Sequence, residues 1–231
     1  FVVFILPALA RARSEAYHPS CQYNLKKVGL YLKMYRDENR QGFFPELLSE
    51  PGMLAISNIS GYPFYLEYIT DPSLLFCVEK EEREKCEEWR ADPNPQVLFN
   101  HSSYMYLGYA MESEAEVEAF AEAYRQRVAQ GLPFDEDLSV PPGMGNHGND
   151  TIHRLREGVE RYFITDINNP AAGAMVQSEI PVLIERLGNH DHEGGNVLYL
   201  DGHVKFIRYP GDWPMTEKTM AILKSIEAMR K

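Results

Sequence analysis

The chain begins with an unbroken apolar run, residues 1–10, and this run limits what the rest of the chain can fold into. Ten apolar residues make only about half of a helix that spans a bilayer. A signal peptide places its positive charges before the apolar run, whereas Arg11 and Arg13 follow it here. We therefore interpret residues 1–10 as the remainder of a longer apolar helix. The alternative is the start of an ordinary buried helix.

A second helical pattern begins at Ser20. Apolar side chains recur there at helical spacing and form one stripe, made of Leu25, Val28, Leu32 and Tyr35. Pro7 and Pro19 lack the N–H that a helix interior needs, so we predict a kink or break near each, with Pro19 opening a second helical segment. The sequence predicts an N-terminal helix over residues 1–40 and a globular head over residues 41–231.

The composition excludes several classes of protein. Apolar residues make up 44% of the 231 residues and charged residues 25%, which supplies a buried core and argues against wholesale disorder. The formal net charge is −11. Because an acidic surface repels phosphate backbones and no basic stripe offsets it, we expect no nucleic-acid partner.

Strand signals recur along the head. Residues 103–110 and 181–185 have the composition of strands. Two alternating segments over residues 196–208 flank Asp201 and Gly202, a pair that suits a two-residue primed turn. The sequence therefore predicts a β-hairpin there.

Helix signals lie between and after these strands. Ser113 and Glu116 have the spacing of a capping box, which opens a predicted helix that Gly131 ends. Residues 151–166 predict a short helix that runs into a strand, and residues 216–229 predict a C-terminal helix.

Several segments together resemble one known family. In chain order they are Leu6-Pro-Ala-Leu-Ala-Arg-Ala-Arg, Ser20-Cys-Gln-Tyr-Asn-Leu-Lys-Lys-Val-Gly-Leu, Gly42-Phe-Phe-Pro, and Gly194-Gly-Asn with Asp201-Gly. The chain resembles the type IV pilin-like, prepilin-type proteins, which include pseudopilins, and their subset named for a His-x9-Asp-Gly motif. It departs from that pattern in two places. Eight residues separate His192 from Asp201 and ten separate His190 from it, where the motif has nine, and Ile5 stands where the family has an acidic residue.

The resemblance implies an α+β, pilin-like fold, in which a long N-terminal helix packs on an antiparallel β-sheet with extra peripheral helices. It implies a structural subunit, not an enzyme, in an extracellular filament or type II secretion pseudopilus of the bacterial cell envelope. Its partners would be copies of itself in a helical homopolymer, and the membrane before assembly. The assembly residues would be the apolar start of the helix: Phe1, Val2, Val3, Phe4, Ile5, Leu6 and Leu9.

The three cysteines offer one disulfide. Family members often have cysteines at positions resembling Cys21 and Cys77, so the resemblance implies a bridge between helix and head there. A short local loop between Cys77 and Cys86 is the alternative. Geometry decides between them, because bridged Cα atoms lie within about 7 Å.

A calcium ion is a further hypothesis, based on the acidic charge and on oxygen-rich loops. Pseudopilins that resemble this chain often hold calcium in a C-terminal loop. The candidate ligands are Asp166, Asn168, Asp191 and Asp201.

Two other classes of function stay open. His190, His192 and Asp201 could form the site of a metal-dependent hydrolase, because His-x-His on a strand places both rings on one face. An aromatic-rich head could also serve as a surface-displayed binding module for glycans or a partner protein.

Overall fold

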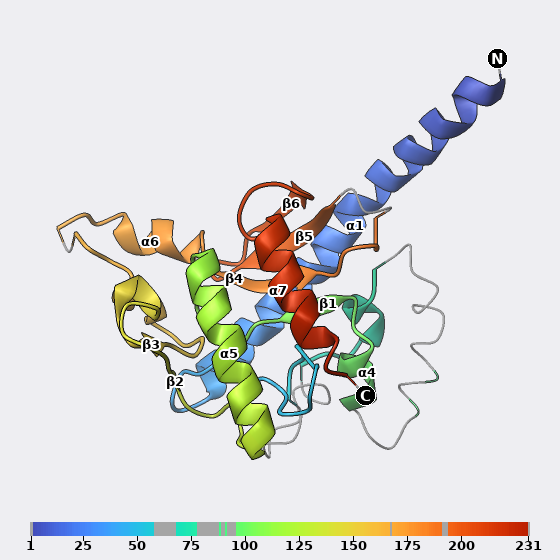
Figure 1. The fold of residues 1–231 in the computed structure, drawn as a ribbon. Helices are drawn as coiled ribbons and strands as arrows, with labels where there is room; N and C mark the ends of the chain where they lie inside the picture. The colour runs from blue at the N-terminus through green and yellow to red at the C-terminus, as the bar shows by residue number, and fades with distance from the viewer. Residues whose placement is uncertain are drawn as a thin grey trace.

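The computed structural model describes residues 2–57, 68–77, 88, 91, 96–166, 168–190 and 194–230, and for residues 2–18 the course of the helix alone. The fold is α+β, with an N-terminal helix and an antiparallel sheet (Figure 1). The helices are α1 (Val2–Glu38), α4 (Gln96–Asn100), α5 (Glu114–Gln130), α6 (Ala172–Gln177) and α7 (Glu217–Glu227), with 3-10 turns η1 (Pro72–Leu75), η3 (Asn146–Gly148) and η4 (Val159–Tyr162). The strands are β1 (Tyr104–Tyr106), β2 (Leu138–Ser139), β3 (Thr151–Ile152), β4 (Pro181–Glu185), β5 (Gly194–Tyr199) and β6 (Val204–Arg208).

The main sheet has the strand order β1-β4-β5-β6, and all its pairs are antiparallel. It lies between α1 on one face and the α5–α7 side on the other (Figure 1). A Cβ on Gly29 of α1 would lie 2.9 Å from Leu198 Cδ1, and one on Gly195 would lie 2.9 Å from Met215 Cε, just before α7. Since successive strand residues point to opposite faces, β5 is covered on both sides. Every residue of β4 and β5 is accordingly buried.

Helix α1 is one continuous helix from Val2 to Glu38, so the prediction that a new helical segment begins at Pro19 is wrong. A proline removes one backbone hydrogen bond, and the burial of Cys21 and the stripe after it holds the rest of this helix in place. Three members of the predicted stripe, Leu25, Val28 and Leu32, are fully buried against the sheet, which confirms this part of the prediction. The first turns of α1 extend away from the rest of the chain (Figure 1). Among the residues that the structure describes, no helix combines the length and apolar character that a membrane crossing requires.

The predicted helix after Ser113 is α5, and Gly131 ends it in the left-handed region at φ 66°. Ser113 Oγ accepts a hydrogen bond from the Glu116 N–H at 3.3 Å, as a capping residue does. The Glu116 carboxylate differs from the capping-box pattern, because it accepts from the N–H of Glu112, at 2.6 Å, and from Asn146. It therefore ties the start of α5 to the η3 loop.

Strand β4, the β5–β6 hairpin and α7 confirm the predictions for the last third of the chain. The prediction of a two-residue turn at Asp201 and Gly202 is wrong. Residues 200–203 connect β5 to β6. Gly202 has a positive φ of 98° but Asp201 does not, whereas both primed turns need a positive φ at their first central residue. Asp201 Oδ1 accepts a hydrogen bond from the His203 N–H at 2.9 Å, which holds the wider turn.

The short helix and strand predicted over residues 151–166 are also wrong. The segment starts extended, because Thr151–Ile152 pairs with β2 and Arg154 bridges to Tyr109. It then forms the 3-10 turn η4, and residues 162–165, all of them described, form no strand. Pairing with distant backbone overrides the local periodicity here.

Candidate functional site

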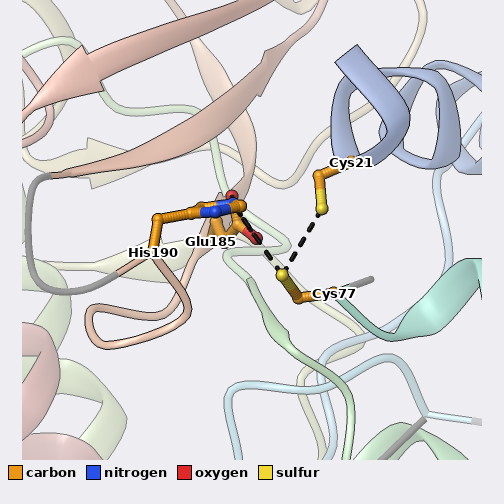
Figure 2. Close-up of side chains that lie close together, drawn as sticks. All are labelled: Cys21, Cys77, Glu185 and His190. Atoms are coloured by element: carbon orange, nitrogen blue, oxygen red, sulfur yellow. Dashed lines mark hydrogen bonds and ion pairs between the residues drawn. The ribbon is translucent and has the colours of Figure 1, made fainter. Parts of the chain in front are cut away.

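Four buried side chains from distant parts of the chain converge between α1 and the sheet (Figure 2). Cys21 Sγ lies 3.4 Å from Cys77 Sγ, and Cys77 Sγ lies 3.8 Å from His190 Nε2. His190 Nε2 lies 3.1 and 3.2 Å from the two carboxylate oxygens of Glu185. All four side chains are fully buried. We call them the Cys–Cys–Glu–His cluster.

Different elements supply these side chains. Cys21 stands one turn before Leu25 on the buried stripe of α1, so the packing of that helix aims its sulfur at the sheet. Cys77 follows η1, and its N–H donates to Ser103 Oγ at 2.8 Å. Glu185 ends β4 and His190 lies in the loop to β5. Figure 2 shows the two cysteines reaching in from one side and His190 and Glu185 from the other.

Two asparagines hold the carboxylate of Glu185 in place. Glu185 Oε2 accepts from the Asn196 N–H at 3.0 Å and from Asn196 Nδ2 at 2.7 Å. Glu185 Oε1 accepts from Asn189 Nδ2 at 3.3 Å. The orientation of the carboxylate is therefore fixed by groups of the sheet and its loop.

Two buried side chains of the cluster, Glu185 and His190, are ionisable. Burial alone would raise the pKa of Glu185, but hydrogen bonds with His190 and Asn196 hold it below its ordinary value. Burial would lower the pKa of His190, while contacts with Cys21 and Glu185 raise it to about 10. Both shifts favour the charged pair, an imidazolium that faces a carboxylate. Burying such a pair carries a desolvation cost of several kcal/mol per ion, of the order found for buried salt bridges.

The cysteines predicted to pair, Cys21 and Cys77, are brought together, and both are thiols in the structure. The disulfide between them stays a prediction. The alternative with Cys86 falls outside the described residues.

The predicted calcium ligands lie in two loops. Asp166 and Asn168 are exposed before α6, where Asp166 Oδ1 accepts from the Asn168 N–H at 3.0 Å. Asp201 is exposed in the β5–β6 turn, and Asp191 lies outside the described residues. Within the described part of the chain, neither Asp166 nor Asp201 belongs to a group of three or more His, Cys, Asp or Glu side chains that could share an ion.

His190 and Asp201, the two residues of the hydrolase hypothesis that the structure describes, are not brought together. His190 precedes β5 and Asp201 follows it, and this strand of six residues spans about 20 Å. Asp201 pairs with His203 in its own turn, at 2.7 Å. His192 lies outside the described residues.

Sequence reasoning missed Glu185 and the two asparagines. One signal for Glu185 was available: it ends a strand whose other residues are all apolar, five positions before His190. A carboxylate on such a strand is buried and needs a partner.

The residues predicted to drive assembly lie at the start of α1, and Phe1 lies outside the described residues. Comparison of the chain with family models, with curated proteins and with solved structures found no match in any of the three.

Proposed function

We propose that this chain is a structural subunit that assembles with copies of itself through the start of α1, as type IV pilin-like proteins do. The observation that carries the proposal is the course of α1, whose first turns extend beyond the body of the chain (Figure 1). The sequence of those turns is apolar from Phe1 to Ala10. An apolar helix outside the core exposes a surface that stacking of identical subunits would bury.

A second observation supports the same function. On the part of α1 that packs against the sheet, Tyr23, Leu30 and Met34 are large apolar side chains that are 57%, 51% and 42% exposed. They recur at helical spacing and share one face of the helix. At 100° per residue, positions Ile5 and Leu9 fall on that same face. Apolar residues therefore stand at positions 5 and 9 and again at positions 23, 30 and 34 of one helix face, which fits a helix that packs against other helices.

Charge substitutions at the start of α1 test this function. We expect the double variant Ile5→Glu, Leu9→Glu to stay monomeric in sedimentation velocity runs where the unmodified chain forms large assemblies, because a carboxylate in an apolar helix interface is costly to bury. Circular dichroism should show an intact fold, because the first turns of α1 extend beyond the body of the chain (Figure 1).

Met175→Glu is the matched control, because Met175 is 58% exposed on α6 rather than on α1. This variant should assemble like the unmodified chain. Assembly of the Ile5→Glu, Leu9→Glu chain to the same extent as the unmodified chain would refute the proposed role of the helix.

A further inference from the structure

The Cys–Cys–Glu–His cluster has the composition of a metal site. Two thiols, an imidazole and a carboxylate are the ligand types that zinc takes in proteins. Their ligand atoms all lie within 4.8 Å of one another. Calcium prefers six to eight oxygens, and thiolates are too soft for it, so this chemistry selects zinc rather than calcium.

Three of the six distances between the ligand atoms are close to those of a tetrahedral zinc site, and the other three are at most 4.8 Å. With Zn–S bonds of about 2.3 Å and Zn–N or Zn–O bonds of about 2.0–2.2 Å, tetrahedral ligands lie about 3.3–3.8 Å apart. The two sulfurs are 3.4 Å apart, Cys77 Sγ and His190 Nε2 are 3.8 Å apart, and His190 Nε2 is 3.1 Å from Glu185 Oε1. These three edges are within a few tenths of an ångström of the zinc values.

The surroundings of the cluster also suit a metal. Ligands of structural zinc are usually oriented by hydrogen bonds from a second layer of residues. Asn196 supplies two such bonds to Glu185 and Asn189 supplies a third. A disulfide between Cys21 and Cys77 would account for the two sulfurs, but not for a fully buried histidine and glutamate beside them.

We propose that Cys21, Cys77, Glu185 and His190 bind one zinc ion that fastens α1 to the sheet. Binding replaces the Sγ protons of the two thiols and the Nε2 proton of the His190 imidazolium, so it releases protons to solvent. All four ligands come from the protein and all are buried, which leaves no open position for a substrate. The site is therefore structural. The zinc proposal does not depend on whether the chain assembles.

The experiment measures zinc on the full chain, purified without reductant, chelator or affinity metal. We expect about one zinc per chain, retained after desalting. Thiol titration in denaturant with chelator should then find Cys21, Cys77 and Cys86 all reactive. A chain without zinc overturns the proposal, whether its Cys21 and Cys77 are reactive thiols or joined in a disulfide.

Variants locate the zinc. His190→Ala should lower the affinity for Zn²⁺, measured against a competing chelator, by about 100-fold or more, and Asn196→Ala by about 10–100-fold. His203→Ala is the matched control, because His203 pairs with Asp201 in the β5–β6 turn, and it should leave the affinity unchanged. Loss of zinc from His203→Ala but not from His190→Ala overturns the assignment.

If His190→Ala does not fold, substitution of Co²⁺ into the unmodified chain still tests the proposal. Unmodified chain loaded with Co²⁺ should show the thiolate charge-transfer band and the intense visible absorption of a tetrahedral site. A weak octahedral spectrum without the thiolate band overturns the proposal.

Discussion

The contact between Gly29 and Leu198 makes the packing of α1 on the sheet measurable. A Cβ on Gly29 would lie 2.9 Å from Leu198 Cδ1 and 3.1 Å from Cδ2. Leu198 is buried, so its side chain has little room to move away. Alanine at position 29 therefore brings two opposing effects: a better helix former in α1 and an overpacked contact with β5.

The sizes of the two effects decide whether Gly29→Ala raises or lowers the free energy of unfolding. Gly→Ala inside a helix stabilises by about 1 kcal/mol, and an extra methyl in a packed core costs about 1–3 kcal/mol. We expect Gly29→Ala to lower the free energy of unfolding by about 0–2 kcal/mol. Leu198→Ala should lower it by about 2–5 kcal/mol and leave room for the new methyl group.

In the Leu198→Ala background, Gly29→Ala should therefore stabilise the chain by about 1 kcal/mol, with a coupling of about 1–3 kcal/mol between the two sites. Urea unfolding followed by circular dichroism measures the four free energies, and the Ile5→Glu, Leu9→Glu background keeps assembly out of the equilibrium. Stabilisation of the unmodified chain by Gly29→Ala, with strictly additive effects in the double variant, would show that α1 does not approach β5 at this point.

Two further predictions concern the hydrogen bonds of Asp137 and Ser113. Burial would raise the pKa of Asp137, but hydrogen bonds from His153 and the Arg154 N–H lower it below its ordinary value. Its stabilising effect is therefore complete above the ordinary pKa and is lost as the pH falls through the folded value. Asp137→Asn should lower the free energy of unfolding by about 1–2 kcal/mol at neutral pH, and the difference should vanish in acid. Urea unfolding of both chains from neutral pH to acid measures this difference in the free energy of unfolding. A difference that stays constant with pH would contradict the prediction. Ser113→Ala should cost about 1 kcal/mol while Ser113→Asp keeps the stability, since both Ser and Asp cap a helix. An equal loss in both variants would show that the cap does not stabilise α5.

Local signals predicted the elements whose residues are close in sequence. The stripe that includes Leu25 and Leu32, the cap at Ser113 and the hairpin around Gly202 each depend on spacing within one element. Pro19 shows the limit of such rules, because a proline weakens a helix without obliging it to end.

The candidate site was predicted only in part. The pairing of Cys21 with Cys77 came from a family resemblance, and the two sulfurs do lie in contact. Glu185 and His190 join them because α1, the segment after η1 and the end of β4 meet in three dimensions. Convergence of that kind depends on tertiary packing, and no spacing within a single segment encodes it.

The proposed assembly through α1 is tested most directly by negative-stain electron microscopy of the full chain beside the Ile5→Glu, Leu9→Glu variant at the same concentration. We predict filaments of regular width for the full chain and for Met175→Glu, and single particles for the Ile5→Glu, Leu9→Glu variant. Single particles from the unmodified chain, or filaments from the variant, would contradict it.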